Sequence, residues 1–65
     1  MKQQQGTRER LLEAAENLFA EYGYTETSLR MISQAADVNI ASANYHFGGK
    51  EGLWKAVMMK YAPMA

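Results

Sequence analysis

Hydroxyl, amide and imidazole side chains are concentrated in one short stretch of this 65-residue chain, residues 38–49, where His46 is the only group that can carry a charge. Such side chains form hydrogen bonds, but the chain offers little for catalysis. Ser33, Ser42 and His46 have no acidic orienting partner in a known triad motif. The chain has no cysteine and a single histidine, which argues against thiolate and multi-histidine metal sites. We therefore expect no enzyme activity, no metal and no cofactor.

The sequence Gly48-Gly49-Lys50 is superficially similar to the end of a nucleotide-binding P-loop. It lacks the first glycine of the GxxxxGK pattern, and Glu51 stands where that loop needs Ser or Thr for magnesium. If Lys50 instead begins a helix, its ammonium and the first helical amides suit a phosphate group. The alternative is a solvated lysine.

Apolar residues recur at helical spacing and predict an all-α chain. The expected helices cover residues 7–22, about 28–35, 40–47 and 50–62. Tyr22 belongs to the same apolar stripe of the first helix as Leu11 and Leu18. The residues that we expect in the core are Leu11, Ala15, Leu18, Phe19, Ile32, Ala36, Val38, Ala43, Phe47, Leu53 and Val57.

Helix ends are marked by residue types that favour them. Thr7 is predicted to cap the first helix, Thr27 and Ser28 the second, and Asn39 the third, because short polar side chains accept hydrogen bonds from the first helical amides. Gly23, Gly48-Gly49 and Pro63 are predicted to end the first, third and fourth helices, since glycine adopts left-handed backbone angles and proline cannot continue a helix.

The two short helices and the residues between them fit a helix-turn-helix. Asp37-Val38-Asn39 forms the turn, Ala36 is small enough for the helices to meet, and Val38 is an apolar pin. In that motif the second helix enters the DNA major groove while the first crosses the backbone. Many other helical hairpins share this spacing, so the motif alone does not prove DNA binding.

The composition indicates a single small globular domain, with 48% hydrophobic and 22% charged residues. The net charge is zero, which at first argues against nucleic acid. The distribution is uneven, because residues 9–26 are acidic and residues 27–65 are mildly basic. No apolar run approaches the length of a membrane span, and we expect a cytoplasmic protein without membrane contact.

Residues 7–61 resemble the amino-terminal DNA-binding domain of TetR-family transcriptional repressors. The resemblance is carried by Leu11-Leu12-Glu13-Ala14-Ala15 with Leu18-Phe19 and Gly23-Tyr24, by the run from Thr27 to Val38, and by the run from Tyr45 to Leu53. It implies a homeodomain-like fold, a three-helix helix-turn-helix head followed by the start of a fourth helix. Asp37 stands where the family usually has glycine.

The resemblance also implies how the whole protein works. Residues 1–65 would be the DNA-binding domain, with an ordered core of about 7–61, and the ligand-binding and dimerisation domain would be missing from this chain. The intact protein would be a homodimer on a near-palindromic double-stranded operator in the bacterial cytoplasm, associated with the nucleoid. Repression would be relieved by a small-molecule effector on the missing domain.

Site residues follow from the motif and the resemblance together. Arg30 is expected to bind a base edge or a phosphate, or to be a surface arginine without a partner, and His46 to bind phosphate or to pack beside Phe47. Thr27 and Ser28 combine helix capping with phosphate contact. The predicted base contacts are Arg30, Asn39, Ile40, Ala41, Ser42, Asn44 and Tyr45, and the predicted phosphate contacts are Thr27, Ser28, Tyr45, His46 and Lys50.

A helical protein-interaction module without DNA binding is the rival interpretation. It is supported by the zero net charge and by apolar residues on more than one face of the fourth helix, which are usually covered by another surface. In the TetR interpretation the missing domain covers them. These residues are Trp54, Met58, Met59 and Tyr61.

Overall fold

The computed structural model describes residues 6–61 and contains only helices in that range. The helices are α1 (Thr7–Glu26), α2 (Leu29–Ala36), α3 (Ile40–Phe47) and α4 (Lys50–Tyr61). The predicted all-α class and the order of helices are confirmed. Among the described residues, every helix is too short or too polar to cross a membrane.

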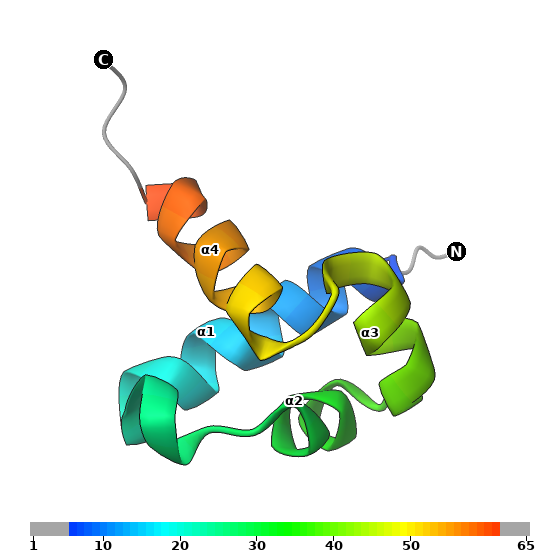
Figure 1. Ribbon diagram of the computed structural model, residues 1–65, viewed down its shortest axis with the longest axis horizontal. Helices are drawn as coiled ribbons and strands as arrows, with labels where there is room; N and C mark the ends of the chain where they lie inside the picture. The colour runs from blue at the N-terminus through cyan, green and yellow to red at the C-terminus, as the bar shows by residue number, and fades with distance from the viewer. Residues whose placement is uncertain (1–5, 62–65) are drawn as a thin grey trace.

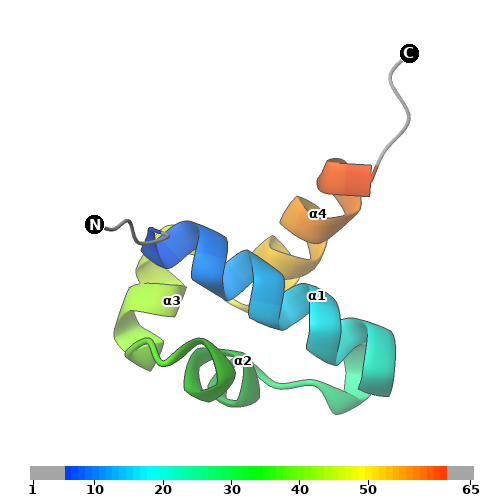
Figure 2. The same ribbon diagram turned by 180° about the vertical axis from the view of Figure 1, so that it is seen from behind.

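The long helix α1 is the platform on which the other helices are arranged. It runs through the middle of the molecule, with α2 on one side and α4 rising away on the other (Figure 1). The opposite view shows the same arrangement, with α3 at the outer end of the molecule beside the start of α1 (Figure 2). The helix that the motif assigns to the major groove is therefore peripheral.

The core is built from small and branched apolar residues of all the helices. Leu11, Ile32 and Leu53 are fully buried in one cluster, and burying a side chain of this size contributes about 1.5 to 3 kcal/mol. Most of the predicted core is confirmed, with Leu18, Val38 and Phe47 only partly buried. Thr27, Ser33 and Ala14 are buried as well, which the apolar pattern did not predict.

The predicted end of the first helix is corrected in detail. Gly23 has φ 85° and breaks the helical path, but one more turn follows and α1 ends at Glu26. This turn brings Tyr24, rather than Tyr22, against the rest of the protein, and Tyr22 is 49% exposed. The prediction that Tyr22 belongs to the buried stripe is therefore wrong.

Two of the predicted helix caps are also wrong. Gly6 occupies the N-cap position of α1 without any side-chain hydrogen bond, and Thr7 already lies inside the helix. The predicted cap at Ser28 is confirmed, because its Oγ accepts a hydrogen bond from the amide of Met31 at 3.1 Å, whereas Thr27 does not cap α2. The predicted helix end at Pro63 lies outside the described residues.

An aromatic cluster joins the end of α1 to the start of α4. Trp54 packs edge-on against Phe19 and Tyr24, with ring centroids 5.1 Å apart in both pairs. Lys50 donates a hydrogen bond from Nζ to the carbonyl oxygen of Tyr24 at 2.8 Å, and its ammonium lies 4.1 Å from the centroid of the Tyr24 ring. Trp54, which we expected to need a cover, is thus partly covered by its own chain.

The burial of Leu53 leads to a stability prediction. Leu53→Ala removes a fully buried side chain from α4 and is expected to lower the free energy of unfolding by about 3 kcal/mol, from lost transfer energy and the cavity left behind. Met59→Ala on the same helix is the control, because Met59 is 77% exposed and its loss should cost less than about 0.5 kcal/mol. Urea unfolding followed by circular dichroism measures both, and equal losses would contradict this core.

Candidate nucleic-acid interface

The turn between α2 and α3 is fixed by backbone geometry. Asp37 has left-handed angles, φ 58° and ψ 48°, and the amide of Val38 donates to the carbonyl of Ser33 at 2.9 Å. Asn39 then caps α3, since its Oδ1 accepts a hydrogen bond from the amide of Ala41 at 2.7 Å. The predicted cap at Asn39 is confirmed. The result is a tight helix-turn-helix with α3 as the outer, second helix.

The side chains of α3 divide into a buried face and a solvent face. Ala43 is fully buried and Phe47 is partly buried, so this pair holds the helix on the core. Tyr45 is 87% exposed. Of the predicted base contacts on this segment, Ser42 is half-buried, and the exposed ones are Asn39, Ile40, Ala41, Asn44 and Tyr45. The structure therefore brings the predicted residues onto one accessible helix.

Thr27 is a correction to the predicted phosphate contacts. Its side chain is buried, with 1% of the residue exposed, and its hydroxyl donates to the carbonyl oxygen of Leu18 at 3.1 Å. The hydroxyl therefore links α1 to the start of α2 and cannot reach a phosphate. Ser28 next to it is exposed. Its Oγ accepts the capping bond, which leaves its O–H free to donate.

The remaining predicted phosphate and base contacts have different surroundings. His46 is exposed, and its ring lies edge-on to Tyr45, with centroids 5.4 Å apart, and 6.5 Å from the ring of Phe47, so it lies beside Phe47 without being buried. Arg30 is exposed on α2. Lys50 is half-buried, and its bond to Tyr24 is a structural role that the sequence analysis missed.

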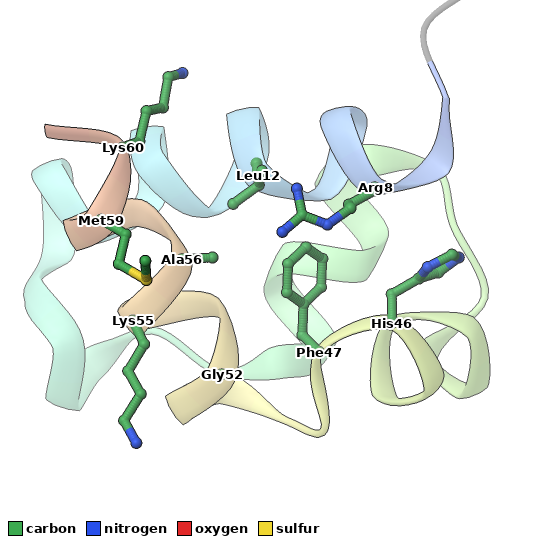
Figure 3. A pocket seen from close by; sticks show the side chains of 9 residues that line it. All are labelled: Arg8, Leu12, His46, Phe47, Gly52, Lys55, Ala56, Met59 and Lys60. Carbon is green, nitrogen blue, oxygen red and sulfur yellow. The ribbon is translucent and has the colours of Figure 1, made fainter.

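A shallow hollow of about 520 Å³ lies beside α3, between the first turns of α1 and the outer face of α4. The guanidinium of Arg8 lies within it, over the ring of Phe47, with 5.1 Å between Cζ and the ring centroid. Figure 3 shows Lys55 and Lys60 at its edge with their side chains directed away from Arg8. Lys60 forms an ion pair with Glu16 at 3.0 Å. The hollow therefore lies beside α3, and the positive charges of Arg8, Lys55 and Lys60 are spread around it and not placed together.

Residues 11–57 match the family model described as bacterial regulatory proteins, tetR family. The chain belongs to the TetR family. This match covers all of the helix-turn-helix and most of α4.

TetR-family relatives share this region at moderate identity. The chain is 38% identical over 55 residues to the probable HTH-type transcriptional regulator YttP of Bacillus subtilis, covering 85% of this chain and 27% of that protein. It is 35% identical over 51 residues to the HTH-type transcriptional repressor AcnR of Corynebacterium glutamicum, covering 78% of this chain and 27% of that protein. Both relatives are named as regulators of transcription.

Solved TetR-like structures have the same fold. The hemolysin II transcriptional regulator HlyIIR superposes with a TM-score of 0.83 at 46% identity, over 88% of this chain and 32% of that one. A HlyIIR mutant with residues 170–185 replaced by alanine gives a TM-score of 0.82 at 47% identity, over 85% and 31%. The chain thus spans about a third or less of the proteins that it matches.

Sequence reasoning gave no role to two residues that hold the TetR helix-turn-helix together. Arg10 donates hydrogen bonds from Nη2 to the carbonyl oxygens of Ala36 and Asp37. Gly52 lies so close to the carbonyl of Phe47 that a Cβ there would collide with it. For Arg10 a clue was present, because it precedes the buried Ala14 by four residues and therefore borders the buried face of α1. No comparable clue identified Gly52.

Thr27→Val tests the corrected role of this residue in the TetR head. Valine has nearly the same shape but cannot form the hydrogen bond to the Leu18 carbonyl, so we expect a loss of about 1 kcal/mol in the free energy of unfolding. Because no phosphate contact is removed, the affinity of the folded variant for duplex DNA should stay unchanged. Denaturation and fluorescence anisotropy measure the two effects. A lower duplex affinity of the folded valine variant would restore Thr27 as a phosphate ligand.

Proposed function

We propose that this chain is the operator-reading domain of a TetR-like transcriptional regulator, and that the intact protein is a ligand-relieved repressor. The observation that carries the proposal is the exposed, hydrogen-bonding face of α3, held at the edge of the molecule by a tight turn. A helix placed in this way fits the major groove, where each base pair presents a distinct pattern of donors and acceptors. Its partner is double-stranded DNA.

The side chains of α3 suit particular base edges. The amide of Asn44 has the donor and acceptor that pair with adenine, whereas Ile40 and Ala41 suit the methyl group of thymine. Asn39 uses its Oδ1 for the helix cap, so its NH₂ group is the part that can reach a base. Ser42 lies between these positions and Tyr45 follows them. This surface therefore favours operators that contain A·T pairs. Its contacts depend on the identity of the bases, unlike a purely electrostatic contact with the DNA backbone.

The DNA backbone would be held by groups at the edges of the same surface. Ser28 at the start of α2, together with Tyr45 and His46 at the end of α3, can donate hydrogen bonds to phosphate oxygens. Lys50 begins α4 and contributes the charge. One of its three ammonium donors is occupied by the Tyr24 carbonyl, which leaves two for a phosphate. Arg30 on α2 reaches either a phosphate or a base edge.

The intact protein is proposed to act as a homodimer on a near-palindromic operator. A single recognition helix contacts only a few base pairs, and two heads about 34 to 36 Å apart are needed to span adjacent major grooves. Repressors among the relatives, such as AcnR, support regulation by repression. The effector, a small molecule, would bind to a domain other than residues 1–65, and the protein would work in the bacterial cytoplasm.

A helical protein-interaction module is the second candidate function. It is favoured by the exposure of Met58, Met59 and Tyr61 on α4, because grouped apolar side chains on a surface often mark a contact with another protein. Binding of duplex DNA at low salt separates the two candidates, since a DNA-reading head binds even unrelated duplexes under those conditions. No binding at low salt would favour the interaction module.

The proposed division between base and phosphate contacts gives a paired prediction. Asn44→Ala should reduce the preference for the selected operator with little effect on binding to unrelated DNA. Lys50→Ala should weaken binding to every duplex alike and lower the slope of log affinity against log salt by about one. Gel shift or anisotropy over a salt series measures both, at a temperature where circular dichroism shows each variant folded.

Lys55→Ala is the matched control for Lys50, because Lys55 is exposed on the same helix and was assigned no DNA contact. It should leave both affinity and salt slope close to those of the unaltered chain. If Lys50→Ala changed the preference between DNA sequences and left the average affinity for duplex DNA unchanged, the assignment of Lys50 to the phosphate backbone would be wrong.

A further inference from the structure

Arg10 connects the first turn of α1 to the turn that precedes the recognition helix α3. Its Nη2 donates to the carbonyl oxygen of Ala36 at 2.7 Å and to that of Asp37 at 3.0 Å. These contacts bridge 26 and 27 residues of sequence. Among residues 6–61, they are the only hydrogen bonds between α1 and this turn.

The bonds of Arg10 go to the backbone rather than to a side-chain charge. The Asp37 carboxylate is fully exposed, and its Oδ2 lies 3.9 Å from Nη2, a separation at which an exposed pair contributes little. The two carbonyls, in contrast, belong to the last residue of α2 and to its C-cap, where carbonyl groups have no partner inside the helix. A guanidinium at a helix carboxyl end also complements the partial negative charge there.

The other end of α3 also rests on the first turn of α1. Arg8 lies over the ring of Phe47, the last residue of α3 (Figure 3). Arg10 holds the residues just before α3, and Arg8 contacts the residue that ends it. The two arginines, two positions apart on α1, therefore bracket the recognition helix at its two ends.

We propose that Arg10 is a positioning residue for sequence preference, which sets the placement of α3 in the groove without binding DNA itself. This inference rests on the proposed DNA-reading function. Hydrogen bonds to base edges depend steeply on angle, so a small rotation of α3 disturbs the contacts of Asn44 and its neighbours. Contacts to phosphates depend mainly on charge and tolerate such a rotation. Loss of Arg10 should therefore reduce preference and spare general affinity.

This role differs in a measurable way from the usual role of an arginine in a DNA-binding domain. An arginine that neutralises a phosphate contributes nearly one unit to the slope of log affinity against log salt. An arginine that acts through the protein backbone contributes nothing to that slope. The salt dependence of binding thus distinguishes a positioning residue from a phosphate ligand, even when both variants bind DNA less well.

The test compares Arg10→Met with Lys55→Met, which removes an equal charge from an exposed site away from the turn. A preferred duplex is first selected from a random library with the unaltered chain. Affinities for that duplex and for a scrambled one are then measured over a salt series. Arg10→Met should lower the ratio of the two affinities about tenfold, the size of one mismatched base pair, with an unchanged salt slope. Lys55→Met should keep the ratio.

A measurement without DNA keeps the two proposals separable. Hydrogen exchange of the Val38 amide, which donates to Ser33 within the turn, should be faster in Arg10→Met and unchanged in Lys55→Met. If the unaltered chain bound no duplex at all, the proposed function would fail, and this exchange rate would still decide whether Arg10 holds the turn. Arg10→Lys, which keeps the charge and one donor head, gives the same comparison if the methionine variant does not fold.

Two results would overturn the proposal. One is an equal loss of affinity for both duplexes with a slope lower by about one, which would make Arg10 a phosphate ligand. The other is an unchanged affinity ratio together with unchanged exchange at Val38, which would show that the bonds to Ala36 and Asp37 do not control the placement of α3.

Discussion

The chain turns between α2 and α3 through a single left-handed residue, Asp37, and the position of every proposed base contact on α3 depends on that turn. A non-glycine residue with these angles is strained by roughly 1 kcal/mol or more, so the surroundings must hold it. They do so through the amide of Val38, the cap at Asn39 and the guanidinium of Arg10. With the turn fixed, α3 presents one face to solvent and Ala43 to the core.

The basic side chains explain how a chain of zero net charge can serve as a DNA-reading head. Several of them bind the chain itself: Arg8 lies over Phe47, Arg10 over the turn, Lys50 on Tyr24 and Lys60 on Glu16. These contacts engage the four side chains within the fold, and of the four only Lys50 is also assigned to a phosphate. Discrimination between DNA sequences then depends on the amide, hydroxyl and apolar groups of α3. Such groups recognise base edges by shape and hydrogen bonding and do not attract DNA in general.

The sequence predicted the helices and the exposed face of α3 because both depend on local spacing. Apolar residues three and four apart identify a buried face, and glycine or a short polar residue marks an end. Thr27 and Lys50 show where this reasoning fails. Their hydroxyl and ammonium could equally face solvent or a carbonyl of a distant segment, and only the packing of α1 against α2 and α4 directs them to Leu18 and Tyr24. The hydrogen bond from Arg10 to the carbonyl of Ala36, 26 residues further along the chain, also depends on packing between distant segments.

The central claim is that the exposed face of α3 meets the bases of duplex DNA. Chemical-shift mapping of backbone amides during titration with a selected duplex tests it most directly. We expect the largest changes at Asn39–Tyr45, with smaller ones at Ser28 and at the start of α4, while the buried Leu53 stays unaffected. Changes confined to the outer face of α4 around Met58 and Tyr61, with α3 unperturbed, would contradict the claim.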